Sequence, residues 1–226
     1  MSKRHAFTLI EMLVVIAIIG IVAALVINMN SGAQAAKRNA QVNADKSGLM
    51  LMINDYHSKL NFFPPDNTNL ATLSVTSPVA FSNYDVVAST NPLLYELTGS
   101  VNNTTGLYAG TITTFDGTNV PMATFQLLYG RTAVANANTD EPHNFFQTGP
   151  QGKEYTNYDA VPLLKGLIVP VILSTTPNQD GTQPANFWHY DASSTNRHNL
   201  QGYDLWAEYV TGTKNGALII TTNGNW

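Results

Sequence analysis

The sequence predicts an α+β fold in which one long N-terminal helix packs on an antiparallel β-sheet formed by the C-terminal part of the chain. Two observations predict the helix: an apolar run extends from Phe7 to Ile27, and an amphipathic stripe follows it. The third observation is a set of strand-like segments after Val161, separated by Asp-Gly and Asn-Gly turns. A long Thr- and Asn-rich insertion lies between the helix and the sheet.

The apolar run is interrupted only by Thr8, Glu11 and Gly20. As a helix of about 1.5 Å per residue it covers about 31 Å, which matches a hydrocarbon core of about 30 Å. Lys3 and Arg4 precede it, so the positive-inside bias predicts a single-pass segment with a cytoplasmic N-terminus and the polar bulk outside. A cleaved signal peptide is the alternative, but its apolar region would be only about 7–15 residues long and would not contain a carboxylate.

The helix is expected to continue beyond residue 30 as an amphipathic segment. Its apolar positions recur at helical spacing, and they are Val42, Leu49, Ile53, Tyr56 and Leu60. Proline removes a backbone donor and disfavours helix in the residue before it, so the helix should end before the Pro-Pro pair at 64–65.

Strand signals dominate the C-terminal region. The expected strands cover residues 167–173, 186–191, 203–209 and 217–221. We expect them to form an antiparallel meander packed on the second half of the helix. Within the insertion, residues 91–98 predict a short helix, and Asp116-Gly117 predicts a tight turn.

The composition excludes several function classes. Charged residues make up 12% of the chain and the formal net charge is −4, so no basic surface is available to neutralise nucleic-acid phosphates. The chain has no cysteine, which excludes a disulfide framework, a thiolate metal site and a cysteine nucleophile. No local serine-hydrolase, zinc-protease or dinucleotide-binding motif is present, and we expect no enzymatic activity.

The residues from Ala6 to Gly20, AFTLIEMLVVIAIIG, resemble the class III signal of type IV pilins and type II secretion pseudopilins. The resemblance implies that prepilin peptidase cuts between Ala6 and Phe7 and methylates the new amine. It also implies that Glu11 pairs with the Phe7 amine of a neighbouring subunit. The chain departs from the family at Ala6, where glycine is usual, and at Asn28, where proline is common.

The same resemblance implies a life cycle. The precursor would be held in the bacterial inner membrane, and an inner-membrane assembly platform would build it into a homopolymeric filament. That filament would be a pseudopilus for protein export or a type IV pilus. The alternative is a low-copy minor pilin that displays a binding module, with exposed Trp188 and tyrosines as its signature.

The C-terminal end also resembles the major pseudopilin, through Tyr203-Asp204-Leu205-Trp206 and the closing Asn223-Gly224-Asn225-Trp226. That pseudopilin binds calcium in its C-terminal loop, and the resemblance implies Asp204 and Glu208 as the side-chain ligands. Lys214 stands where the family has acidic residues. Calcium is the one cofactor that the sequence suggests.

A second cluster, His189, Asp191 and His198, is interpreted as strand and loop residues, because the spacing matches no compact metal motif. The predicted organisation is a leader peptide at 1–6, a membrane and filament-core helix at 7–30, its amphipathic continuation at 31–62, a variable insertion at 63–160 and a sheet region at 161–226.

Overall fold

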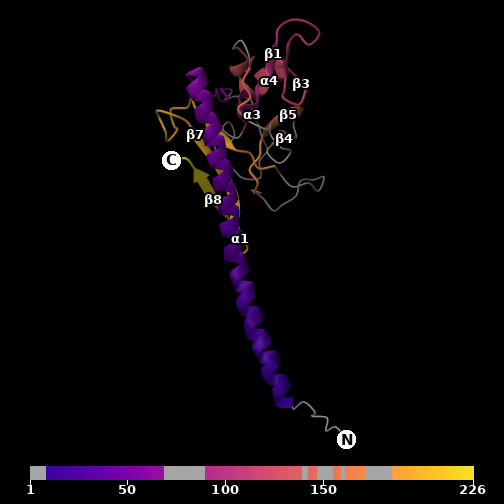
Figure 1. The fold of residues 1–226 in the computed structure, drawn as a ribbon, viewed down its shortest axis with the longest axis vertical. Helices are drawn as coiled ribbons and strands as arrows, with labels where there is room; N and C mark the ends of the chain where they lie inside the picture. Colours follow the sequence, from indigo (N-terminus) through magenta and orange to yellow (C-terminus); the bar gives the residue numbers. More distant parts are fainter. Residues whose placement is uncertain (1–8, 69–89, 139–141, 147–154, 159–160, 172–184) are drawn as a thin grey trace.

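The structure is a computed structural model. It describes residues 9–68, 90–138, 142–146, 155–158, 161–171 and 185–226, with backbone alone for 24–31, 138, 155–158 and 161–164. The head lies at one end of a single long helix, whose N-terminal half projects away from it (Figure 1). The predicted α+β class is confirmed.

Helix α1, Leu9–Leu60, has 52 residues and is unbroken. At about 1.5 Å per residue it is about 78 Å long. The predicted apolar stripe faces the head: Val42, Leu49, Ile53 and Tyr56 are buried. The helix ends at Asn61, whose φ of 63° is left-handed and whose N–H bonds to the His57 carbonyl at 2.8 Å.

The insertion folds into a small α/β unit with its own core. The predicted short helix is α3, Leu93–Thr98. The strands β1 (Val101–Asn103), β2 (Thr111–Thr113) and β3 (Asn119–Pro121) form an antiparallel sheet, followed by α4, Met122–Tyr129, and a 3₁₀ turn η1, Asn136–Asn138. The predicted Asp116-Gly117 turn joins β2 to β3, with Gly117 at φ 81°. The core of this unit consists of Tyr95, Ile112, Val120, Phe125, Tyr129 and Val134.

The C-terminal sheet has the order β6-β7-β8, all antiparallel. Its strands are β6 (His189–Asp191), β7 (Asp204–Lys214) and β8 (Ala217–Gly224). The first half of β7 is buried almost continuously, since it lies between β6 and β8 and packs on α1. This confirms the last three predicted strands.

The bounds and the pairing predicted for the first strand, at 167–173, were wrong. The strand there is β5, Val161–Leu167, and it pairs with β4, Tyr155–Tyr158, in a separate two-stranded sheet. A single bridge from Ile168 to Phe187 links it to the segment before β6. Residues 172–173 lie outside the described part of the chain. The predicted four-stranded meander is therefore three strands and a neighbouring hairpin.

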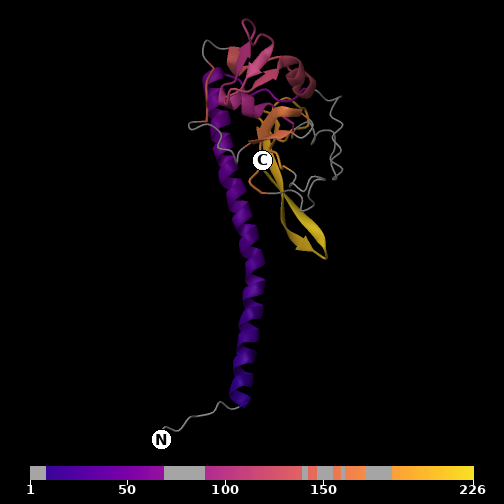
Figure 2. The ribbon, with the colours of Figure 1, turned by 90° about the vertical axis from the view of Figure 1, so that its right-hand side faces the viewer.

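The main core is formed where α1, α3 and β7 pack together. Ile53 and Tyr56 from α1 share one apolar cluster with Leu94 of α3 and Leu205 of β7. Figure 2 shows α3 and β7 lying against the second half of α1. Burial of this helix face is therefore what attaches the head.

The Ile53→Ala variant tests that attachment. Ile53 is fully buried, so we expect the free energy of unfolding to fall by about 2–5 kcal/mol. Leu51→Ala is the matched control, because Leu51 is 63% exposed on the same helix and should change stability by no more than about 0.5 kcal/mol. Urea unfolding of the full chain in detergent, followed by tryptophan fluorescence, measures both. Equal losses would contradict the assignment of the buried face.

Candidate functional site

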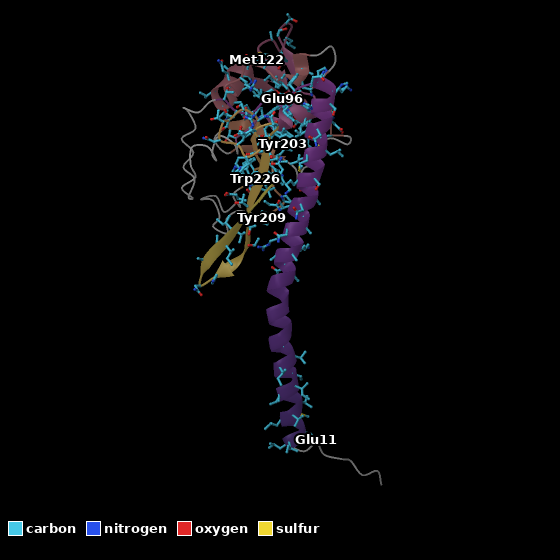
Figure 3. All side chains as sticks on the ribbon, turned by 90° about the vertical axis from the view of Figure 1, so that its left-hand side faces the viewer. Glu11, Glu96, Met122, Tyr203, Tyr209 and Trp226 are labelled. Carbon is cyan, nitrogen blue, oxygen red and sulfur yellow. The ribbon has the colours of Figure 1, made fainter. Side chains whose placement is uncertain are left out.

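The exposed half of α1 is the largest apolar surface of the described chain. Every residue from 9 to 23 is exposed, and Glu11 is the one charged residue among them. The exposed aliphatic and methionine side chains here are Leu9, Ile10, Met12, Leu13, Val14, Val15, Ile16, Ile18, Ile19, Ile21 and Val22. Figure 3 shows Glu11 near the free end of α1, far from the head. A soluble monomer rarely exposes an apolar patch of this extent, so the surface indicates a partner or a membrane.

Ala6 and Phe7, the predicted processing residues, lie outside the described part of the chain. The predicted apolar span from Phe7 to Ile27 also lies partly outside it, since residues 7–8 and the side chains of 24–27 are not described. Within what the structure describes, no helix is both long enough and apolar enough to cross a membrane.

Asp204, a predicted calcium ligand, is fully buried at the start of β7. Its Oδ2 accepts the backbone N–H of His198, with the His198 ring Nδ1 at 3.1 Å. Its Oδ1 accepts the N–H of Asn199 at 2.9 Å. The His198 ring stacks on Trp226 with centroids 4.0 Å apart. The carboxylate therefore holds the 198–199 loop and the chain's last residue in place.

Glu208 lies four positions further along β7 on the same face, roughly 13 Å away at about 3.3 Å per residue. Calcium takes six to eight oxygens at about 2.3–2.6 Å. With the Asp204 oxygens occupied by N–H donors, these two carboxylates do not fit a shared calcium site. Nowhere in the described residues do three His, Asp or Glu side chains group to hold a metal ion. Calcium binding stays a prediction.

In the second cluster, two indole rings separate the two histidines. His189 is buried and stacks on Trp206 with centroids 4.9 Å apart, His198 stacks on Trp226, and the two tryptophans meet edge to face at 5.7 Å. Trp188, the expected signature of an exposed binding surface, is only 2% exposed and belongs to the main core. That interpretation of Trp188 was wrong, because an apolar indole completes the packing of α1 against the sheet.

Glu96 was not predicted to be a buried carboxylate that bonds to several elements. This α3 residue is fully buried, and its Oε2 accepts the Tyr56 hydroxyl at 2.9 Å. The N–H groups of Ala135 and Asn136 donate to Oε1 and Oε2 at 2.8 and 3.0 Å. Burial raises the pKa of Glu96, and these hydrogen bonds oppose the rise. One side chain thus joins α1, α3 and the 135–136 loop.

A pair of buried carboxylates, Asp66 and Asp191, ties the segment after α1 to the end of β6. Asp66 Oδ2 accepts the N–H groups of Ala192 and Ser193 at 2.9 and 3.0 Å, and Asp191 Oδ1 accepts those of Ser193 and Ser194. The other oxygens, Asp66 Oδ1 and Asp191 Oδ2, are buried and face no N–H or hydroxyl donor among the described groups, and a hydrogen bond between the two carboxyl groups favours the protonated form of Asp66. Burial raises the pKa of Asp66, and the neighbouring Asp191 adds to the rise.

A polar seam attaches the C-terminal hairpin to α1. Arg38 Nη1 donates to the Val210 carbonyl at 2.8 Å, and the Tyr209 hydroxyl donates to Asn39 Oδ1 at 2.6 Å. Further toward the end of α1, Lys46 Nζ bonds to Asn223 Oδ1 and to the Gly224 carbonyl. Figure 3 places Tyr209 beside α1. The seam fixes how the head is rotated about the helix.

Fold and surface together define a class: an α+β head carried on a long helix whose other half is an exposed apolar surface. Residues 1–27 match the family model described as the prokaryotic N-terminal methylation motif, which is the class III prepilin signal of the type IV pilin and pseudopilin family. The signal implies a membrane-anchored precursor, and the motif supports a pilin-like protein processed by prepilin peptidase. No curated protein and no solved structure matches the chain.

The buried Asp66 predicts a pH dependence of stability. Its pKa is raised in the folded state above an unfolded value of about 3.9, so the folded chain holds the proton more tightly. The stability this contributes is complete below the unfolded pKa and is lost as pH rises through the folded pKa. We expect Asp66→Asn to unfold at higher urea than the wild type at neutral pH. The difference should grow with pH by at most about 1.4 kcal/mol per unit.

Unfolding curves between about pH 4.5 and 8 measure this difference, a range that lies above the ordinary carboxyl pKa of about 4. Asp55→Asn, which changes an exposed carboxylate on α1, is the control and should follow the wild type at every pH. A constant offset between Asp66→Asn and the wild type would contradict the raised pKa.

Proposed function

We propose that the chain is a pilin-like structural subunit. Prepilin peptidase cuts it before Phe7, and α1 then assembles it into a type II secretion pseudopilus or a type IV pilus. The observation that carries the proposal is the coincidence of the methylation motif at residues 1–27 with the exposed apolar half of α1. Before assembly, the same half holds the precursor in the bacterial inner membrane as a single pass, with the head outside.

Glu11 has a specific role in this proposal. A carboxylate on an otherwise apolar helix half becomes costly once neighbouring helices remove it from water. The new amine of Phe7 in an adjacent subunit is a cation at the correct end of the helix, four residues away. Pairing the two shifts adjacent helices by four residues, about 6 Å. The charge pair therefore selects one axial register among many apolar ones.

Processing is tested by the mass of the mature chain. We expect it to start at Phe7 and to carry one added methyl group when prepilin peptidase is present. Omitting the peptidase should leave the chain intact at Met1. A mature chain starting after Ala35, where Ala33-Gln34-Ala35 resembles a signal-peptidase site, would contradict the assignment of the leader, as would an uncut chain in the presence of the peptidase.

Assembly is tested by Glu11→Gln, which keeps the shape and removes the charge. The neighbouring amine is then buried without a partner, a cost of about 3–5 kcal/mol, so we expect the assembly constant to fall by about 100-fold or more. Fibre yield by electron microscopy, at equal levels of cut subunit, measures it. Asp55→Asn is the control outside the apolar half and should assemble like the wild type. Normal fibres from Glu11→Gln would show that the pairing is not used.

The second candidate, a low-copy minor pilin that binds a target, is favoured by one loop. Leu107 and Tyr108, between β1 and β2, are 90% and 53% exposed. They lie in the loop at the end of the head farthest from the N-terminus (Figure 1). Labelling the subunit in intact fibres separates the two candidates, because a structural subunit is found along the whole fibre and a tip binder at one end.

A further inference from the structure

The tip of the β7–β8 hairpin is an unpartnered apolar surface. Three consecutive residues of β8, Leu218, Ile219 and Ile220, are 37%, 43% and 40% exposed. Because side chains alternate along a strand, both faces of the tip carry aliphatic groups. In the described chain β8 pairs only with β7, so its other edge is open as well. An exposed apolar edge strand of this kind is a surface for association with another chain.

A β-bulge directs this tip away from its own helix. The polar seam holds β7 to α1 as far as Val210, and among the described residues no hydrogen bond joins the two elements beyond it. The register shifts between Val210 and Gly212, which makes Thr211 the extra residue. A bulge bends the strand and increases its twist. Figures 2 and 3 show the hairpin leaving the head toward the N-terminal half of α1 while diverging from it.

Along the helix axis, the tip stops short of the exposed apolar residues 9–23 of its own α1. Leu218 lies two residues before Ile220, the partner of Val210, so it lies about 7 Å past the seam. Val22, the last exposed large aliphatic residue of the segment 9–23, lies 16 residues before Arg38, about 24 Å away along the axis. A second copy shifted toward the head by roughly 17 Å places its own Val22 level with the tip.

We propose that the hairpin tip docks on the apolar helix half of another copy of this chain in the fibre. The inference rests on the proposed function. The partner is a second copy because the largest exposed aliphatic surface of the described chain is this same helix half, and the hairpin extends in its direction.

Introduced thiols test the contact cleanly, because the chain has no cysteine. We expect Ile220→Cys combined with Val22→Cys, Ile19→Cys or Ile16→Cys to give a ladder of disulfide-linked multimers from oxidised fibres. At least one of the three pairs should link, and each single variant should stop at the dimer. Leu107→Cys combined with Val22→Cys is the control and should give no ladder, since Leu107 lies at the far end of the head.

A second measurement is fibre yield from the double variant Leu218→Asn/Ile220→Asn. Loss of two buried aliphatic contacts should lower the yield at least about tenfold, with Leu107→Asn unchanged. Both substituted residues are surface-exposed, so the head stays folded, which urea unfolding verifies.

Fibres that form normally but give no ladder at any of the three positions overturn the docking and leave the proposed function standing. So does a tip thiol that reacts with a lipid-borne reagent in assembled fibres, because the membrane is then its partner. A processed wild-type chain that forms no fibres overturns the proposed function itself, and the inference with it.

Discussion

The structure depends on one constraint: a single unbroken helix must have two different surfaces. The second half of α1 buries Val42, Ile53 and Tyr56 against the head, while the aliphatic side chains of residues 9–23 are exposed. Helix propensity alone does not require this division, because both halves are helical. The hydrophobic effect does, since the exposed half is stable only against lipid or other helices. The head and its attachment are arranged around that division.

A head with few charges still has to bury some of them. Charged residues are scarce in the sequence, yet Glu96, Asp66, Asp191 and Asp204 are all nearly inaccessible. All four accept backbone N–H groups from loops, which satisfies donors that short strands and turns leave unpaired. The carboxylates therefore hold irregular loop segments in place through hydrogen bonds. Their desolvation is the source of the raised pKa values at Glu96 and Asp66.

The elements that could be predicted are those whose pattern is local. The α1 stripe follows a helical period, and β7 and β8 are joined by Asn215-Gly216, whose positive φ values suit a tight turn. The strands β1 to β3 were not predicted, since three Asn- or Thr-rich residues carry too little periodicity. Hydrogen bonds such as Tyr56 to Glu96 join residues 40 apart, and only the tertiary fold brings them together. Ala6, Phe7 and Glu11 were predicted from a motif, not from packing.

In the proposed fibre, the polar seam would link the orientation of the head to the axial register of the assembled helices. Glu11 and Arg38 are 27 residues apart on one continuous helix, about 40 Å along its axis. Any axial or rotational position that neighbouring helices adopt near Glu11 is carried along this rod to the seam. Arg38, Asn39 and Lys46 bind the hairpin from three points along α1, which prevents the head from turning independently. In the proposed fibre, an ordered head surface therefore needs no head-to-head bonds, because the helix that would set the register also orients the head.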